Sequence, residues 1–314
     1  MPPRRLLIDT DPGQDDAVAL LLALASPAEL SVEGITTVGG NSGIANTTRN
    51  AAAILELAGR TDIPLHAGCD VPLLRAPVRA DHVHGETGLD GAGLPPPSTQ
   101  PGAAHAVDFL IGTLRAEPPG AFTVVTLGPM TNLALALRMA PDIAGRIARV
   151  VSMIGACFEG GNITPSAEFN AYADPEAAAI VFSAGIPMTV LPLDVTHQMR
   201  GTRARLDAFA ALGNRAGRCV AGMLGFSERF DLKKYESDGA PLHDPCTIAW
   251  LLRPDLFTGR EVNVAVETRG DFTSGATVVD YWRVTDRPPN ALYLRDGDAD
   301  GFYALLTERL ARLP

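Results

Sequence analysis

The sequence predicts an α/β fold: an open, mostly parallel sheet of the Rossmann-like kind, with helices on both faces and an antiparallel edge. Short aliphatic runs alternate with longer Ala- and Leu-rich runs along most of the 314 residues. Alternation of this kind is typical of parallel sheets whose connecting helices cover both faces. Three further strand-like runs near the carboxyl terminus, at residues 261–267, 276–281 and 291–294, predict the antiparallel edge.

The first unit of the chain sets the pattern for the rest. Residues 6–8 form a short aliphatic run, as expected of a buried parallel strand, and residues 17–25 form a longer run typical of a helix. Pro12 and Gly13 break the chain between them. The later expected elements are strands at 30–38, 124–127, 149–154 and 188–191, and helices at 47–58, 175–184 and 245–250, one that ends at 140 and one from 302.

No linker, internal repeat or low-complexity segment divides the chain, so we expect one domain over residues 1–314. Two long irregular stretches, residues 70–101 and 156–173, follow strand-like segments. Loops of this length in a compact domain are usually functional. We therefore expect both stretches near the sheet edge that carries the turn after the first strand.

The composition is that of an ordinary globular protein, with 46% hydrophobic and 20% charged residues. A net charge of −10 without any basic run argues against nucleic acid as a partner. The longest apolar run, residues 17–25, is too short to span a bilayer, and we expect neither a signal peptide before the first strand nor a membrane partner. The cysteines form no Cys-x-x-Cys pair, which indicates a reduced, cytoplasmic protein: Cys69, Cys157, Cys219 and Cys246.

Four aspartates, Asp9, Asp11, Asp15 and Asp16, fall within eight residues where the first strand meets the first helix. Crowded carboxylates repel, and a shared hard cation such as Ca²⁺ or Mg²⁺ is one arrangement that tolerates them, because it prefers oxygen ligands. The alternative is an acidic helix start with a solvated first turn, since the helix dipole favours acids there. One or two acids would suit that alternative, but four beside a Pro-Gly turn fit it poorly.

Polar residues also follow later strands. Asn41 lies in a Gly-rich loop that lacks the Gly-Lys-Ser/Thr ending of a nucleotide-triphosphate site. Residues 160–170 carry Asn and Glu side chains suited to a polyhydroxylated ligand such as a sugar, and a polar surface loop is the equal alternative. Asp244 can add a carboxylate to a metal, and His243 is placed for proton transfer near neutral pH. Asp244 as a simple helix cap before Pro245 is the alternative, which leaves His243 unexplained.

This set of motifs resembles the inosine/uridine-preferring nucleoside hydrolases. Residues 9–17 (Asp-Thr-Asp-Pro-Gly-Gln-Asp-Asp-Ala) are very similar to the amino-terminal signature of that family. The resemblance continues in the family's order through residues 40–41, 84–90, 128–132, 168–170 and 243–245. Together these motifs are highly specific, although none would be alone. The resemblance implies hydrolysis of the N-glycosidic bond of ribonucleosides to ribose and free base.

The resemblance also implies a bound Ca²⁺, held by Asp11, Asp16, Asp244 and the backbone carbonyl of Leu127. Asp11 would be the catalytic base that takes a proton from the attacking water, in agreement with the lowered pKa of a water on a cation. The implied substrate-binding residues around the ribose are Asp15, Asn41, Met153, Asn162, Glu168, Phe169 and Asn170.

At the base end of the substrate, the resemblance assigns His243 as the acid that assists base departure and places His84 in a loop that closes over the base. Tyr235 matches a position that contacts the base in pyrimidine-preferring members, whereas Asp231 stands where an amide is expected. We expect uridine and cytidine as preferred substrates with inosine as a further one; a purine-preferring or broad-specificity enzyme is the alternative. Family members commonly form dimers or tetramers, so a homodimer or homotetramer is expected.

Two readings from other functional classes compete. A phosphatase with an Asp nucleophile at a strand end would need an Asp-x-Asp-x-Thr/Val pattern, whereas Pro12 and Gly13 follow Asp11. A non-catalytic nucleoside-binding protein would bind without turnover, and the intact acids and His243 argue against it.

Overall fold

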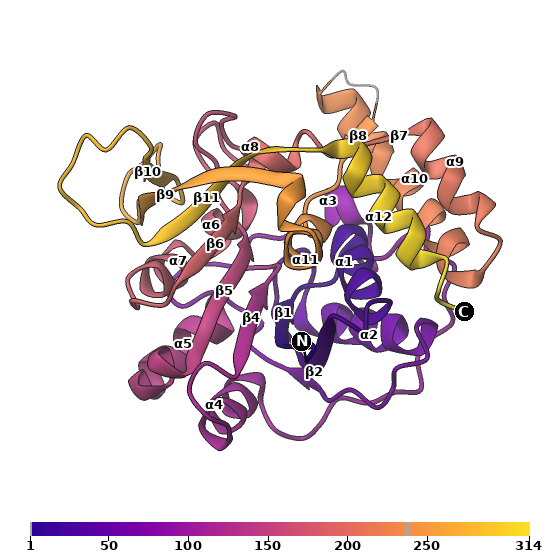
Figure 1. Cartoon of the computed structure of the whole chain (residues 1–314), viewed down its shortest axis with the longest axis horizontal. Helices are drawn as coiled ribbons and strands as arrows, with labels where there is room; N and C mark the ends of the chain where they lie inside the picture. The colour runs from indigo at the N-terminus through magenta and orange to yellow at the C-terminus, as the bar shows by residue number, and fades with distance from the viewer. Residues whose placement is uncertain (1, 236–238) are drawn as a thin grey trace.

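The computed structural model describes residues 2–235 and 239–314, without the side chains of residues 81–82 and 228–235. In this part of the chain, nine strands form one sheet in the order β10-β9-β11-β6-β5-β4-β1-β2-β3 (Figure 1). The parallel strands are β1 (Arg4–Thr10), β2 (Leu30–Thr37), β3 (Leu65–Ala67), β4 (Phe122–Thr126), β5 (Ile147–Met153), β6 (Met188–Leu191) and β11 (Ala291–Gly297). The order β3-β2-β1-β4-β5-β6 is that of the Rossmann fold, and the mostly parallel sheet expected from the sequence is confirmed.

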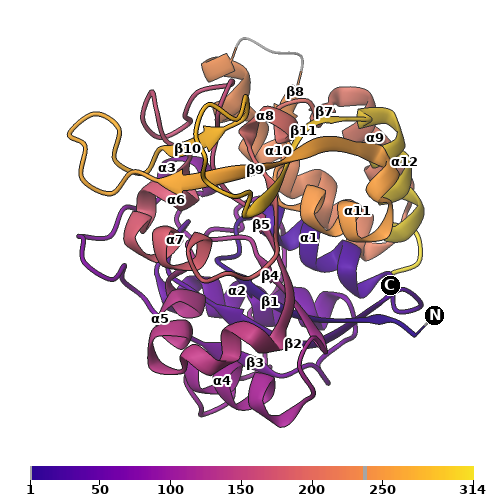
Figure 2. The same cartoon turned by 60° about the vertical axis from the view of Figure 1, so that its left-hand side comes forward.

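The antiparallel edge is also confirmed. Strand β9 (Phe257–Val266) pairs antiparallel with both β11 and β10 (Thr277–Asp280), and Figure 2 shows these strands at one side of the sheet. All three strands overlap the runs expected from the sequence. A separate two-stranded sheet joins β7 (Arg200–Thr202) to β8 (Gly239–Pro241).

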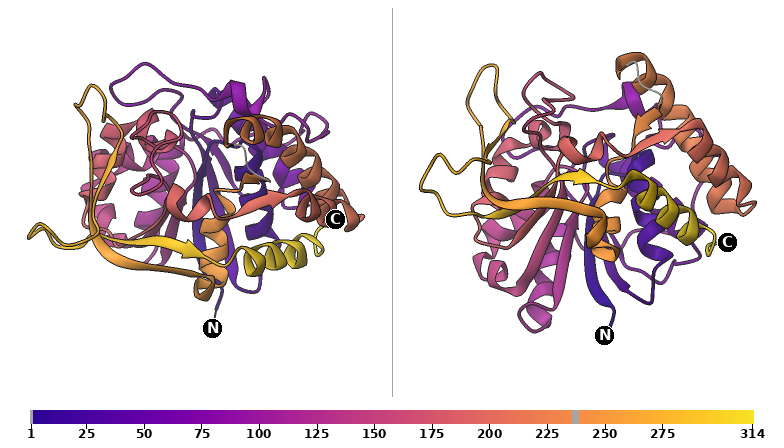
Figure 3. Two further views of the ribbon diagram at one scale, coloured as in Figure 1. Left: turned by 90° about the horizontal axis from the view of Figure 1, so that it is seen from above. Right: turned by 45° about the horizontal axis from the view of Figure 1, so that its top comes forward.

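Helices cover both faces of the parallel strands. One face carries α1 (Gln14–Leu24), α2 (Ile44–Leu57), α9 (Arg203–Ala211), α10 (Arg215–Tyr235), α11 (Pro245–Leu252) and α12 (Ala299–Leu310) (Figure 3). The other carries α4 (Ala106–Ala116), α5 (Thr131–Met139) and α7 (Pro175–Phe182). Alternation along β1 explains the two layers: Leu6 and Ile8 pack into the first, and Leu7 into the second.

The topological switch point lies between β1 and β4, which are neighbours in the sheet but lead to helices on opposite faces. The backbone N–H of Leu127, just after β4, donates to the carbonyl of Asp9 at 2.9 Å. This contact fixes the end of β4 beside the turn that carries the aspartates. Ligands of open α/β sheets bind at such a point.

Several elements differ from the sequence prediction. The predicted irregular stretches contain two short helices, α3 (Asp81–His84) and α6 (Phe169–Ala173), and α2 begins three residues before the predicted start. Several elements were not expected from the sequence: α4, α9, α10, the four-residue α8 (Leu193–Thr196), β3 and the β7–β8 sheet. Short 3-10 turns lie at Pro141–Arg146 and Pro254–Leu256. Among the described residues, no helix combines the length and apolar character needed to cross a membrane.

Candidate active site

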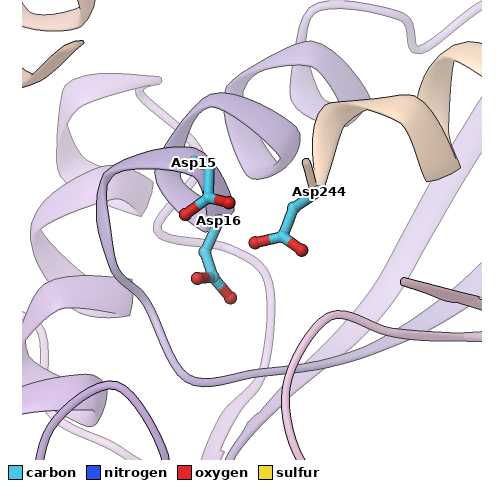
Figure 4. A group of neighbouring side chains, drawn as sticks. All are labelled: Asp15, Asp16 and Asp244. Carbon is cyan, nitrogen blue, oxygen red and sulfur yellow. The ribbon is translucent and has the colours of Figure 1, made fainter. Parts of the chain in front are cut away.

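Three carboxylates meet at the switch point. Asp15 and Asp16 lie in the first turn of α1, and Asp244 directly precedes α11 (Figure 4). One oxygen atom from each of the three lies within 4.8 Å of the others, a separation that suits ligands of one metal ion. Figure 4 shows the three side chains turned toward a common space.

The turn between β1 and α1 is folded around Asp16. Its carboxylate accepts hydrogen bonds from Thr10 Oγ1 at 2.5 Å, from the backbone N–H of Asp11 at 3.2 Å and from that of Gly13 at 3.0 Å. The bond from Gly13 satisfies a donor at the helix start in the manner of a capping box. Asp16 therefore holds the turn in shape and is itself held in place for a ligand.

Asp11 lies beside this group in a narrow backbone cradle. Its Oδ2 accepts from the backbone N–H of Asn41 at 2.7 Å, whereas no described residue hydrogen-bonds to its buried Oδ1. A Cβ placed on Gly40 or Gly128 would lie 2.0 or 2.1 Å from the Asp11 carboxylate, so both positions require glycine. Asn41 links the acids, because its Nδ2 also donates to Asp16 Oδ2 at 3.1 Å.

The crowding has an electrostatic cost. Burial, followed by the charges of Asp16 and Asp15, raises the pKa of Asp11 well above its usual value. Burial and Asp15 likewise raise the pKa of Asp16, and burial with three neighbouring aspartates raises that of Asp244 well above normal. A bound cation relieves both the repulsion and the burial of charge. Together with the orphaned Oδ1 of Asp11, this means that the residues present fit a hard cation.

The helix-cap explanation of Asp244 is not supported. Its backbone is already helical, with φ −61° and ψ −38°, and its side chain makes no capping hydrogen bond. The carboxylate is buried and faces the other acids instead. Asp15, Asp16 and Asp244 are the three mutually close carboxylates, and Asp11 lies beside them through its contacts with Asn41.

A pocket opens over these acids. The lining includes these residues named from the sequence: Asp15, Asn41, His84, Leu127, Met153, Asn162, Glu168, Phe169, Asn170, His243 and Asp244. Asp11 and Asp16 lie beneath this lining, both completely buried. The two long stretches therefore do reach the sheet edge expected of them.

Residues of the second stretch are fixed against the sheet. Asn170 Nδ2 donates to the carbonyl of Leu127 at 2.7 Å and to that of Met153 at 3.0 Å. Glu168 caps α6 and accepts from three backbone N–H groups, including that of Gly155 at 2.9 Å. Burial raises the pKa of Glu168 to about 7. Asn162 Oδ1 accepts from the N–H of Phe169 at 2.9 Å, which holds the loop closed on itself.

His84 is tied to the aspartate turn by a residue that the sequence analysis did not single out. Gln14 Oε1 lies 2.6 Å from His84 Nδ1, and Gln14 Nε2 donates to the carbonyls of His84 and Asp90 at 3.1 and 3.3 Å. Gln14 is buried, although it stands between Gly13 and Asp15 in an otherwise acidic turn. The presence of an amide among the acids of this turn is the one sequence feature that could have identified Gln14.

His243 lines the pocket, as do the apolar residues Leu206, Leu224 and Leu242. Its Nδ1 lies 2.8 Å from Thr196 Oγ1, and its ring centroid is 5.6 Å from that of His197. The sequence assigned no role to His197, whose Nδ1 contacts Glu159 Oε1 at 2.9 Å.

The structure also places two further histidines and the four cysteines. His66 stacks on Phe109 and His105 caps α4, so both have structural contacts. The four cysteines are unpaired. The side chains of Asp231 and Tyr235 lie outside the described residues, so their contact with the base stays a prediction.

Comparisons with known proteins agree with this geometry. The family description "Inosine-uridine preferring nucleoside hydrolase" matches residues 6–304. The chain is 50% identical over 307 residues to the pyrimidine-specific ribonucleoside hydrolase RihA of Citrobacter koseri, which covers 98% of this chain and 97% of the relative.

Solved structures give the same result. A plant nucleoside hydrolase superimposes with a TM-score of 0.91 at 34% identity, covering 99% of each chain. The purine-preferring ribonucleoside hydrolase from Gardnerella vaginalis superimposes with a TM-score of 0.91 at 31% identity, covering 98% of each chain. The chain therefore belongs to the inosine-uridine preferring nucleoside hydrolase family.

Proposed function

We propose that this nucleoside hydrolase cleaves ribonucleosides to ribose and free base, with uridine and cytidine preferred and inosine as a further substrate. The observation that carries the proposal is the pocket, whose lining combines crowded acids and amides with His243. The preference for pyrimidines rests on the higher identity to a relative named pyrimidine-specific, 50% against 31% for the purine-preferring enzyme.

The metal is proposed to be calcium, held by Asp11, Asp16, Asp244 and the carbonyl oxygen of Leu127, all of which offer oxygen. Asp15, which lies within 4.8 Å of Asp16 and Asp244, adds negative charge beside them. When bound, calcium would supply the positive charge that these carboxylates lack and acidify a water molecule at the site.

Asp11 is proposed as the base that takes a proton from the attacking water. Its raised pKa suits this role, because a base is most effective when its pKa approaches the working pH. The oxygen of the water forms a bond to the anomeric carbon of the ribose while the bond to the base breaks. The transition state resembles an oxocarbenium ion, and the neighbouring carboxylates stabilise its positive charge.

The ribose is proposed to lie against Asp15, Asn41, Asn162, Glu168 and Asn170, with Met153 and Phe169 packed beside the sugar. All of these residues line the pocket. Carboxylates and amides supply the mixture of acceptors and donors that adjacent hydroxyl groups need. These residues are therefore proposed to hold the ribose so that its anomeric carbon lies over Asp11.

His243 is proposed to donate a proton to the departing base, which keeps the electron pair of the broken bond. His84, which lies in the irregular stretch of residues 70–101, is proposed to cover the base. The whole chain is proposed to act as one domain in a cytoplasmic homodimer or homotetramer, and four unpaired cysteines fit a reducing compartment.

The experiment that tests this proposal compares His243→Ala with the wild type on uridine and on p-nitrophenyl riboside. The nitrophenolate leaves without protonation, whereas uracil leaves more readily when an acid protonates it. We expect the variant to lose roughly 10²- to 10⁴-fold in kcat on uridine and far less on the phenolic substrate. Equal losses on both substrates would remove His243 as the acid. A wild type that releases no ribose from uridine would contradict the proposed preference.

A further inference from the structure

We propose that Thr196 is a positioning residue for base departure: its hydroxyl orients the imidazole of His243 so that Nε2 faces the leaving base. This inference rests on the proposed function, in which His243 is the acid. Thr196 makes no contact with the pocket itself and acts only through His243.

The contact between the two side chains is short and partly buried. Thr196 Oγ1 lies 2.8 Å from His243 Nδ1, and Thr196 is completely buried. His243 lines the pocket whereas Thr196 does not, so the Nδ1 edge of the ring is turned away from the substrate. Nε2 is separated from Nδ1 by Cε1, so it is the ring nitrogen that remains to face the substrate.

The backbone around both residues is held independently of any substrate. Thr196 ends α8, and its N–H donates to the carbonyl of Pro192 at 3.1 Å. The N–H of Leu242 donates to the carbonyl of Met199 at 2.9 Å, which fixes the chain just before His243. The tilted ring of His197, 5.6 Å away, packs beside that of His243. The hydroxyl therefore contacts a ring whose backbone is already in place.

A hydroxyl group is chemically suited to this task. When His243 is doubly protonated, Nδ1–H donates to Thr196 Oγ1, and Nε2–H donates to the base once the substrate is bound. As the bond between the anomeric carbon and the base breaks, the base nitrogen takes the proton from Nε2, and Nδ1–H still donates to Oγ1. A carboxylate in the place of the hydroxyl would favour the charged imidazole and resist this transfer. Solvent returns the proton after turnover, so no further reactant is required.

The test compares Thr196→Val, which keeps the shape and removes the hydroxyl, with Thr196→Ser, which keeps the hydroxyl. Each variant is assayed on uridine and on p-nitrophenyl riboside. We expect Thr196→Val to lower kcat on uridine by about 10- to 100-fold, a partial loss of the roughly 10²- to 10⁴-fold contribution of general acid catalysis, with little change in KM. On the phenolic substrate, and for Thr196→Ser on both substrates, kcat should stay within about threefold of the wild type.

Thr189→Val is the matched control. Thr189 is also completely buried, and its hydroxyl accepts from Arg149 Nη1 at 3.0 Å, away from the pocket. We expect this variant to keep the wild-type ratio of activities on the two substrates. If Thr196→Val does not fold, Thr196→Ala against Thr196→Ser gives the same comparison, because both shorten the side chain.

Two outcomes would overturn the inference. Equal losses on both substrates would make Thr196 a structural residue only, and full activity of Thr196→Val on uridine would show that the hydroxyl is not needed. His243→Ala separates this failure from failure of the proposed function. If His243→Ala is selective for uridine and Thr196→Val is not, only the inference fails; if neither is selective, the acid role of His243 fails first.

Discussion

At the scale of single residues, the site is dominated by carboxylates that the fold keeps close together. Asp11, Asp16 and Asp244 are buried, and the pKa of each is raised by burial and by neighbouring acids. Ionised acids in this arrangement destabilise the fold in the absence of a cation. The arrangement is therefore explained by binding and catalysis rather than by stability.

The substitution Asp11→Asn tests whether the buried acids serve catalysis rather than stability. Removing the proposed base, which is also a proposed ligand, should lower kcat on uridine by roughly 10³-fold or more. The fold should persist, because an amide oxygen can still accept from the N–H of Asn41 and one buried charge is removed. Melting in EDTA should therefore occur at or above the wild-type temperature. Near-normal turnover would exclude Asp11 as the base.

The sequence predicted the acids, the amides and His243 but not the residues that position them. The four aspartates lie within eight residues of the chain, so their crowding can be predicted without a structure. Thr196 and His243 are 47 residues apart, and Gln14 and His84 are 70 apart. Threonine and glutamine side chains have many structural roles, and only the folded chain shows which residue each one contacts.

At the scale of elements, α6 illustrates how a short helix can carry part of a site. Glu168 caps its start and also accepts from Gly155, just after β5. The same carboxylate lines the pocket. A five-residue helix has little stability of its own, so this side chain connects the sheet, the helix and the proposed ribose contacts.

Glu168→Gln should change how stability depends on pH. Burial raises the pKa of Glu168 from 4.5 to about 7. The folded state therefore favours the protonated carboxyl, and this contribution to stability is complete below pH 4.5 and is lost as the pH rises through 7. Other buried acids act in the same direction, so the difference between the variant and the wild type is the relevant quantity.

The free energy of unfolding, measured by urea titration in EDTA from pH 4.5 to 7.5, checks this. The wild type should lose up to about 3 kcal/mol more than Glu168→Gln over this range, from the linkage between pKa and stability. The exposed Glu308→Gln is the control and should keep the wild-type slope. Parallel slopes for Glu168→Gln and the wild type would show that Glu168 ionises normally in the fold.

Element prediction succeeded where hydrophobic runs were clear and failed where they were not. β1, β4 and α1 are almost wholly buried, and their aliphatic runs predict them well. β7 and β8 are three residues long, with Gly and Pro among them, and α10 contains three glycines and many charges. Tertiary contacts, rather than a local pattern, define these elements.

At the scale of the whole molecule, the strand order explains why distant segments form one site. β1 and β4 lie side by side at the switch point, and their carboxyl ends carry the aspartate turn and Leu127. Asp244 reaches the same point from the start of α11 (Figure 4). The alternation of strands and helices predicted this convergence, because parallel strands bring their carboxyl ends to one edge. The β7–β8 sheet beside His243 could not be predicted.

The most direct test of the account is the release of reducing sugar from uridine, cytidine, inosine and adenosine in phosphate-free buffer, with and without EDTA. We expect ribose from uridine and cytidine first and from inosine more slowly. EDTA should lower the rate roughly 10²-fold or more, as for loss of a catalytic metal, and added calcium should restore it. A rate of ribose release that EDTA does not change would contradict the account. Faster release from adenosine and inosine than from both pyrimidine nucleosides would also contradict it.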